Sequence, residues 1–225
     1  MHPHLPEILT RLEAVYGKQT RFSSKSALDQ LIATILSQRT TYADEKAAYD
    51  KLLATYGDWT GVAAAPVAGI EACIQTSNYP EVKAPRIKEV LTTIIERHGS
   101  PTLDFLADWP VPEAMEYLMA LPGVGHKTTT FVLLFSLRKP VIPVDTHVHR
   151  TNQRIGILGP KVTQAKAHQI LLELLPADAD YLLNYHKLFF KLGQKICRYR
   201  HPSCERCPVK EFCAYYTEIK QREAR

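Results

Sequence analysis

A lysine and an aspartate near the middle of the chain are the residues best suited to chemistry. Lys127 follows the turn Leu121-Pro-Gly-Val-Gly125, and Asp145 comes eighteen residues later. Two glycines two apart, after a proline, allow the backbone to turn tightly where a side chain would obstruct close approach. The free N–H groups of such a turn, and the N-terminus of a helix that follows it, readily bind phosphate. The stretch therefore predicts a phosphate seat with an amine beside it.

Four cysteines near the C-terminus form a second chemical cluster. Cys197, Cys204, Cys207 and Cys213 have the pattern Cys-x6-Cys-x2-Cys-x5-Cys, whereas Cys73 stands alone. A tight cluster in a large chain binds metal more often than it forms disulfides. Four thiolates hold either one tetrahedral zinc or one [4Fe–4S] cluster, and this spacing does not distinguish the two. Basic residues beside the cysteines form a surface suited to a phosphate backbone.

Helices must position these residues, because no convincing period-two stretch occurs in the chain. We expect the glycine turn to join a helix that ends near Met119 to a buried helix over residues 128–137. Ser26, with Asp29 three residues on, predicts the start of another helix. Further helices are expected over residues 5–16, 44–56, 87–98, 146–155, 163–175 and 178–195, with a short one from Pro66. The chain is therefore predicted to be all-α.

The composition is that of a globular protein with a mild preference for polyanions. The chain has 225 residues, of which 45% are apolar and 23% charged, so it can bury a sizeable core in one or two domains. Its net charge of +5 favours polyanionic partners only weakly. No apolar run approaches the roughly 20 residues needed to span a bilayer, and the N-terminus has no apolar secretory core. We expect a cytosolic protein that contacts no membrane.

Taken together, the motifs closely resemble those of the endonuclease III family of helix-hairpin-helix DNA glycosylases. The resemblance lies in Leu121-Pro-Gly-Val-Gly-x-Lys127-Thr, in Val144-Asp145-Thr-His147-x-x-Arg150 and in the Cys-x6-Cys-x2-Cys-x5-Cys ending. Any one of the three can arise by accident, but all three in this order very rarely do. The resemblance runs from about Ile32 to Cys213, which is most of the chain.

The resemblance implies two all-α lobes with DNA across the cleft between them. A six-helix lobe that contains the hairpin would comprise residues 23–136. The other lobe, residues 1–22 with 137–225, would carry a [4Fe–4S] cluster on Cys197, Cys204, Cys207 and Cys213, with zinc as the weaker alternative. The implied partner is damaged double-stranded DNA, bound by a monomer associated with a bacterial or archaeal nucleoid.

The same resemblance makes Lys127 and Asp145 the catalytic residues. Removal of a base from deoxyribose passes through a transition state with positive charge on the sugar, which a carboxylate can stabilise and an amine can trap. A Schiff base on Lys127 would then permit β-elimination, which cuts the strand 3′ to the lesion. The alternatives are a solvated lysine at 127 and a helix N-cap at Asp145, and the aspartate can fill both roles.

Several further residues would contact the DNA. The hairpin residues Leu121, Gly123, Val124 and Gly125 would bind its backbone. His147 is also placed against DNA by the resemblance, although a hydrogen-bonded structural histidine is the simpler alternative.

Extrusion of a nucleotide leaves a gap in the duplex that two loops would fill. In the first loop, Leu36-Ser-Gln-Arg-Thr40, the usual Ala-Gln of the family is replaced by Gln38-Arg39, so either residue is a candidate plug. In the second loop, Tyr79 stands where an apolar wedge, often leucine, is usual. Tyr79 would stack between bases, the alternative being ordinary loop packing.

The leading hypothesis is a bifunctional DNA glycosylase with abasic-site lyase activity on oxidised or fragmented pyrimidines. Arg39 and Tyr79 depart from the usual pyrimidine-specific loops. They favour mismatched thymine or uracil, or an oxidised purine, as the alternative target. A non-catalytic iron–sulfur DNA-binding module and a zinc-dependent structural adaptor are alternatives of a different class.

Overall fold

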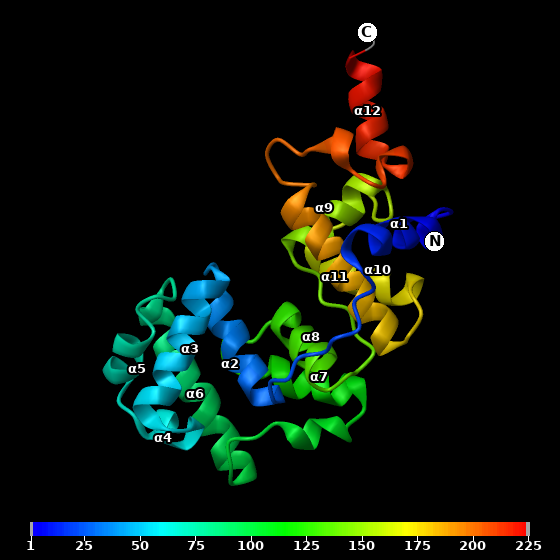
Figure 1. Cartoon of the computed structure of the whole chain (residues 1–225). Coiled ribbons are helices and arrows are strands. Elements are labelled where there is room, and N and C mark those ends of the chain that lie inside the picture. Colours follow the sequence, from blue (N-terminus) through cyan, green and yellow to red (C-terminus); the bar gives the residue numbers. More distant parts are fainter. Residues whose placement is uncertain (1, 224–225) are drawn as a thin grey trace. The chain divides into compact units, whose positions relative to one another are not determined.

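The computed structural model describes residues 2–223, and the chain divides into two compact units. The central unit is Ser23–Lys139, and the terminal unit joins the chain up to Phe22 with the chain from Pro140 onward. All regular structure in the described residues is helical, which confirms the all-α fold class (Figure 1). None of the helices in this part of the chain combines the length and apolarity that crossing a bilayer requires.

Helix α2 (Ala27–Ser37) is the centre of the central unit. It packs against α3 (Tyr42–Tyr56), α6 (Pro80–His98) and α8 (His126–Phe135). Its leucine and isoleucine side chains are at most 2% exposed, and each contributes about 1.5–3 kcal/mol on burial. The helices α4 (Trp59–Ala64), α5 (Val67–Cys73) and α7 (Val111–Met119), with the 3-10 helix η1 (Asp104–Ala107), complete the unit.

The start of α2 is a capping box, as its sequence predicts. The Ser26 hydroxyl accepts a hydrogen bond from the Asp29 N–H at 3.1 Å, and the Asp29 carboxylate accepts one from the Ser26 N–H at 3.3 Å. The same carboxylate accepts hydrogen bonds from the Tyr49 hydroxyl at 2.8 Å and from the Trp59 indole N–H at 2.7 Å. Asp29 therefore links α2 to α3 and α4.

Helix α6 begins at Pro80, earlier than the apolar periodicity predicts. Proline is favoured in the first turn of a helix because the N–H it lacks has no partner there. Pro85 lies inside the helix on its exposed side, where water can satisfy the carbonyl that its missing N–H leaves free. The additional turns place Lys83 and Arg86 on α6.

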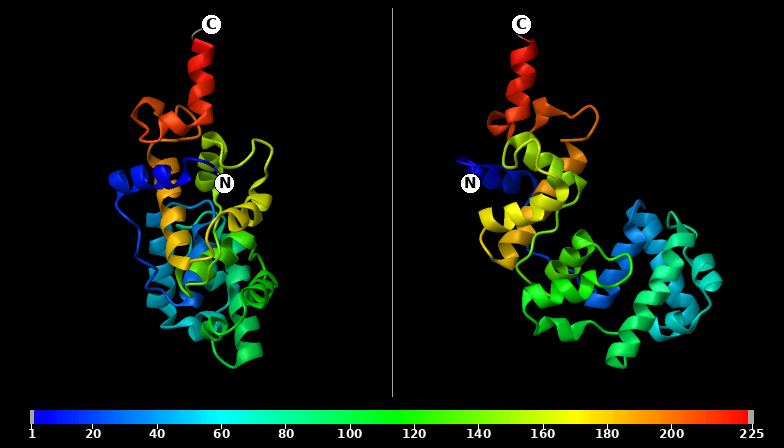
Figure 2. Two further views of the ribbon diagram at one scale, coloured as in Figure 1. Left: turned by 90° about the vertical axis from the view of Figure 1, so that its right-hand side faces the viewer. Right: turned by 180° about the vertical axis from the view of Figure 1, so that it is seen from behind.

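Helix α11 (Ala179–Lys195) is the centre of the terminal unit. It packs against α9 (Thr146–Ile155) and is crossed by α1 (Leu5–Tyr16), as Figure 2 shows. Tyr185 and Phe189 on α11 are fully buried and stacked. The helices α10 (Gln164–Leu174) and α12 (Ala214–Glu223) pack on α9, and the cysteine segment adds the 3-10 helices η2 (Cys204–Arg206) and η3 (Lys210–Phe212).

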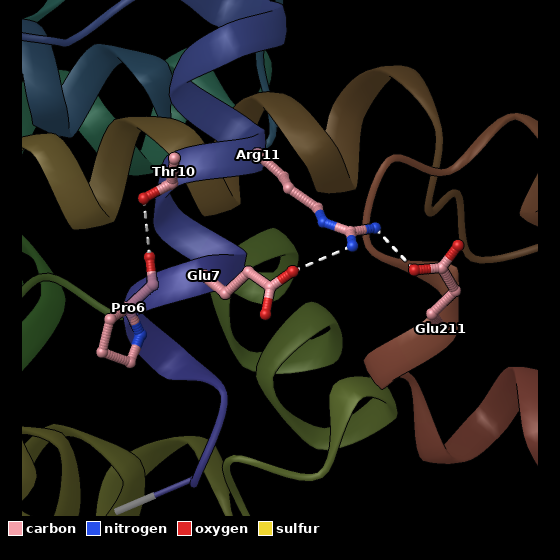
Figure 3. Close-up of polar contacts among 5 residues, drawn as sticks. All are labelled: Pro6, Glu7, Thr10, Arg11 and Glu211. Atoms are coloured by element: carbon pink, nitrogen blue, oxygen red, sulfur yellow. Dashed lines mark hydrogen bonds and ion pairs between the residues drawn. The ribbon is translucent and has the colours of Figure 1, made fainter.

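The N-terminal helix α1 is tied to the cysteine segment. The Arg11 guanidinium bridges the carboxylates of Glu7, at 2.9 Å, and Glu211, at 2.7 Å (Figure 3). It also lies 4.7 Å from the centre of the Phe212 ring. Residues near the two ends of the chain thus meet in one unit.

Candidate functional site

The glycine hairpin joins α7 to α8 in the central unit. Leu121 and Val124 are buried, and the Val124 N–H donates to the Leu121 carbonyl at 3.1 Å. Gly123 has a φ of +71°, a conformation that residues with a side chain rarely adopt. Because the Leu121 and Val124 side chains point into the core, only their backbone groups are available to a ligand.

The hairpin presents free N–H groups to solvent. The N–H groups of Gly123 and Gly125 make no hydrogen bond within the described residues. Gly125 is the N-cap of α8, and its carbonyl accepts the Thr129 N–H at 3.0 Å. A helix N-terminus with unpaired N–H groups attracts anions. This arrangement of N–H groups is suited to bind a phosphate group, and we call it the phosphate seat.

Lys127 lies in the first turn of α8, directly after the hairpin. Its side chain is exposed, and its Nζ lies 5.4 Å from the centre of the Phe131 ring. Phe131 in turn stacks on Phe135 one turn further along the helix. The Lys127 amine is therefore exposed to solvent next to the phosphate seat, and the Phe131 ring lies beside it.

The two loops expected to enter DNA lie together in the central unit. We name residues 37–41 and 76–79 the paired loops. Arg39 is exposed and donates a long hydrogen bond of 3.5 Å to the Tyr79 hydroxyl, with its guanidinium 5.7 Å from the Tyr79 ring centre. Both residues have left-handed backbones, with φ of 56° at Arg39 and 60° at Tyr79. Gln38 is half-buried, so Arg39 is the more exposed of the two candidate plugs.

A lysine that the sequence did not single out lies beneath these loops. Lys83 is only 2% exposed, and burial lowers the pKa of its amine to about 8. Its Nζ donates to the carbonyls of Leu36, at 2.8 Å, and Gln38, at 2.7 Å. It also donates to the hydroxyls of Thr40, at 3.0 Å, and Ser77, at 2.8 Å. We call this arrangement the lysine clamp.

A pocket of about 210 Å³ opens beside the clamp. Its walls are Gln38, Arg39, Tyr79, Val82, Lys83 and Arg86. Arg86 also packs on the hairpin, since a Cβ placed on Gly123 would lie 2.7 Å from the Arg86 Cδ. Arg86 therefore connects the pocket to the phosphate seat, and its charge adds to the attraction for an anion.

Asp145 begins α9 in the terminal unit, whereas Lys127 belongs to the central unit. The Asp145 side chain is 5% exposed and accepts the Val148 N–H at 2.8 Å, which is the expected N-cap. His147 is half-buried: its Nδ1 lies 3.1 Å from Arg150 Nη2, and its ring packs edge-on against Phe190. These contacts support the structural alternative for His147.

The four clustered cysteines line one cavity in the terminal unit, which we call the cysteine cavity. Its enclosed volume is small, about 20 Å³, and its apolar wall includes Ile155, Leu192, Ile196 and Pro202. Within the described residues, no three thiol, imidazole or carboxylate groups are placed to hold a single metal ion. A tetrahedral zinc needs all four sulfurs about 2.3 Å from one centre, whereas an iron–sulfur cluster bonds each sulfur to a different iron.

Burial keeps most of these thiols protonated. Desolvation raises the pKa of the Cys207 thiol to about 11 and also raises the pKa of Cys204 and Cys213. Thiols lose their protons on metal binding, so protonated thiols would oppose the binding of a metal here more strongly as the pH falls.

Two arginines of α9 hold the cysteine segment. Arg150 donates to the carbonyls of Cys197, at 2.9 Å, and Gly193, at 2.8 Å. Arg154 donates to the carbonyls of Arg198, at 2.8 Å, and Tyr199, at 3.0 Å. The basic loop after Cys197 is therefore fixed to α9 through its backbone.

Sequence reasoning missed Lys83, Arg86 and Arg154 as parts of these sites. One signal was available for Lys83. It shares the spacing of Ile87, Val90 and Ile94, so a lysine stands on the buried face of α6. A charged residue on an apolar face indicates buried polar partners. The sequence does not say what those partners are.

The sequence matches a family model described as "HhH-GPD superfamily base excision DNA repair protein" over residues 32–177. It is 34% identical over 195 residues to Endonuclease III of Thermotoga maritima, covering 87% of this chain and 86% of that protein. It is 29% identical to Endonuclease III of Sulfolobus acidocaldarius, with coverage of 87% and 85%.

Solved structures share the fold. A trapped Endonuclease III–DNA covalent intermediate superposes with a TM-score of 0.83 at 23% identity, covering 98% of this chain and 99% of that one. A thermostable thymine-DNA glycosylase gives a TM-score of 0.75 at 22% identity, with coverage of 95% and 94%. These likenesses confirm the expected helix-hairpin-helix glycosylase fold.

Proposed function

This chain belongs to the HhH-GPD superfamily of base excision DNA repair proteins, and we propose that it is a DNA glycosylase that also cuts the strand at the resulting abasic site. The observation that carries the lyase half is Lys127, an exposed amine in the first turn of α8 beside the free N–H groups of the hairpin. A phosphate held by the hairpin would bring deoxyribose to this amine.

In the proposed reaction, Lys127 Nζ forms a bond to the anomeric carbon while the bond from that carbon to the base breaks. The base leaves with the bonding electron pair and takes up the proton that the attacking amine releases. The ring oxygen then leaves the anomeric carbon with its electron pair and is protonated by water, which gives an iminium on Nζ and makes the neighbouring C2′ proton acidic. Loss of that proton expels the 3′ phosphate and cuts the strand. Asp145 would stabilise the positive charge on the sugar, a role compatible with its N-cap hydrogen bond to Val148.

For the cysteine cavity we propose a [4Fe–4S] cluster on Cys197, Cys204, Cys207 and Cys213, with zinc as the weaker alternative. When bound, such a cluster supplies iron–thiolate bonds that crosslink the segment. The chain's own contribution is to hold the basic loop after Cys197 against α9 through Arg150 and Arg154, where the loop suits a phosphate backbone.

The proposed substrates are oxidised or fragmented pyrimidines in duplex DNA. A second target class, mismatched thymine or uracil or an oxidised purine, is favoured by the contact between Arg39 and Tyr79. A panel of duplexes that each carry one lesion separates the two classes. Thymine glycol among the poorest substrates would overturn the first choice.

Reduction with borohydride in the presence of an abasic duplex tests the lysine chemistry. Wild type should form a covalent complex, and Lys127→Ala should form none. Lys166→Ala, which removes an exposed lysine from the first turn of α10, is the matched control and should trap as wild type does. Unchanged trapping by Lys127→Ala contradicts the assignment. Binding without trapping or cutting by wild type would favour the non-catalytic DNA-binding module.

A further inference from the structure

Lys83 is the most enclosed charged side chain near the proposed DNA-binding face, and no catalytic role accounts for it. Its four acceptors come from the end of α2 and from both of the paired loops. An ammonium has three N–H donors, so these partners occupy all of them. The amine also has almost no exposed surface from which to reach a sugar. Lys83 is therefore unsuited to form a Schiff base.

The position of the amine explains how a buried charge is tolerated. The carbonyls of Leu36 and Gln38 lie at the C-terminal end of α2, where the last carbonyls of a helix lack partners and carry partial negative charge. Lys83 supplies the missing donor and places its positive charge at the favourable end of the helix dipole. Burial alone lowers the pKa of Lys83 to about 8, and these acceptors favour the charged form.

The clamp joins two loops that are distant in sequence. Ser77 takes part twice, because its hydroxyl accepts from Lys83 and donates to the Leu36 carbonyl at 2.9 Å. The Asn78 N–H donates to the Thr40 hydroxyl at 3.1 Å, and the Asn78 side chain donates to the Arg39 carbonyl. Each of these bonds thus joins a backbone group of one loop to a side chain of the other, at Arg39 and at Thr40.

This bracing maintains a strained conformation. Arg39 and Tyr79 are non-glycine residues with left-handed backbones, which persist only where surrounding contacts enforce them. Without the clamp we expect both residues to relax toward ordinary backbone angles and to separate. Ordering them again on binding would reduce affinity.

We propose that Lys83 is a positioning residue that holds the paired loops as one preformed unit, so that Arg39 and Tyr79 enter duplex DNA together where a nucleotide has been extruded. The proposal rests on the proposed base excision function. It predicts that loss of the Lys83 amine weakens the binding of duplex substrates, which require insertion of the loops. An abasic sugar in single-stranded DNA requires no insertion and should be insensitive to the clamp.

The test compares Lys83→Met with Lys88→Met on two substrates. Lys88 lies on the same helix and also donates to a backbone carbonyl, that of Ala65 at 2.6 Å, but it is not part of the clamp. Measured are single-turnover cutting of a lesion duplex as a function of enzyme concentration, and borohydride trapping on a single-stranded abasic oligonucleotide. For Lys83→Met we expect the half-saturating concentration on duplex to rise about ten-fold or more, with single-strand trapping within about two-fold of wild type.

Three outcomes decide the proposal. Equal duplex half-saturation for Lys83→Met and Lys88→Met overturns it, and so does an equal loss on both substrates, which indicates general damage to the fold. Partial rescue by Lys83→Arg supports it, because a guanidinium restores donors to the same carbonyls. If circular dichroism shows that Lys83→Met does not fold, Ser77→Ala takes its place. This variant removes one acceptor of the clamp, so it should raise the half-saturating concentration on duplex and leave single-strand trapping unchanged.

Failure of the proposed function would give a different result. Wild type would then neither cut nor trap either substrate. The clamp would be tested in that case by fluorescence of 2-aminopurine placed opposite an abasic analogue in duplex DNA. Wild type and Lys88→Met should change its stacking and Lys83→Met should not, whereas the same change in all three proteins overturns the clamp.

Discussion

Lys83 in the central unit and Arg150 in the terminal unit both donate hydrogen bonds to backbone carbonyls beside a functional segment. The ammonium of Lys83 is compact and almost fully enclosed, and it can lose its proton. The guanidinium of Arg150 is half-exposed and donates to the carbonyls of two residues, Gly193 and Cys197. The compact ammonium therefore suits the enclosed acceptors of the paired loops, and the planar guanidinium suits the separate carbonyls of the cysteine segment.

The paired loops and the cysteine segment differ in the groups that hold them in place. The paired loops satisfy one another through Lys83, Ser77 and Asn78, all within the chain. In the cysteine segment, all four cysteines line one cavity, and Arg154 donates to the Cys197 sulfur at 3.4 Å and accepts from the Cys213 thiol at 3.2 Å. The loops are therefore held by groups of the chain alone, and the proposed metal group would add bonds to a segment that Arg150 and Arg154 already hold.

The largest expected effect is that of removing one cysteine of the cavity. Cys207→Ser should lose the visible absorption of the cluster and lower the melting temperature by about 10 °C or more, equivalent to about 3–5 kcal/mol. Cys73→Ser, which changes a buried thiol of the central unit that touches Thr55, should keep the absorption. Absorption spectra, iron and zinc analysis and thermal unfolding measure these effects. A colourless wild type that contains zinc would contradict the cluster.

The next effect concerns the arginine that holds the segment. Arg150→Met leaves the carbonyls of Gly193 and Cys197 without their donor, which should cost about 2–3 kcal/mol of unfolding free energy. We also expect faster loss of the metal group to a chelator, followed by the decay of its absorption. Arg11→Ala removes exposed ion pairs to Glu7 and Glu211 and the contact with the Phe212 ring, and it should change both quantities much less. Equal chelation rates for the two variants would contradict the role of Arg150.

A smaller effect separates backbone strain from DNA binding in the central unit. Gly123 and Gly99 both have left-handed backbones, so Gly123→Ala and Gly99→Ala should each lose about 1–2 kcal/mol of stability. A Cβ at Gly99 meets nothing within 4 Å, whereas one at Gly123 would displace Arg86. Only Gly123→Ala should therefore weaken duplex binding, by about ten-fold, in fluorescence anisotropy at constant salt. Equal affinities would exclude Arg86 and the hairpin from the interface.

The smallest effect is the pH dependence of the lysine clamp. Burial lowers the pKa of Lys83 from 10.5 to about 8, so between these values the unfolded chain binds more protons at this group than the folded protein does. Its contribution to the unfolding free energy should therefore rise with pH, by at most about 1.4 kcal/mol per pH unit. Lys83→Met should lack this slope between pH 8 and pH 10 in denaturant unfolding. Arg150→Met should retain it, because that change leaves Lys83 and its acceptors in place. Identical slopes in wild type and Lys83→Met would contradict an enclosed charged amine.

Local signals predicted much of the fold. The capping box at Ser26, the glycine turn and the N-cap at Asp145 each depend on a few adjacent residues, and each is present. The early start of α6 and the short helix α4 were not predicted, because helical periodicity needs several turns to show. Helix α12 was missed because it is mostly polar, with few apolar residues to mark a buried face.

The candidate sites likewise contain parts that the sequence predicts and parts that it does not. Motif spacing selected the hairpin and the four cysteines that line the cavity. The lysine clamp joins residues about 40 positions apart in the chain, and no local pattern encodes such a contact. The exposure of Arg39 relative to Gln38 likewise depends on a left-handed backbone that the sequence does not announce.

The most direct measurement is peptide mass spectrometry of the complex that borohydride traps between wild type and an abasic duplex. We expect the reduced deoxyribose remnant on the peptide that carries Lys127, attached to its Nζ. The remnant should be absent from Lys83, whose amine is enclosed in the clamp. A remnant on Lys83, on the N-terminal amine or on any residue other than Lys127 would contradict the proposed chemistry.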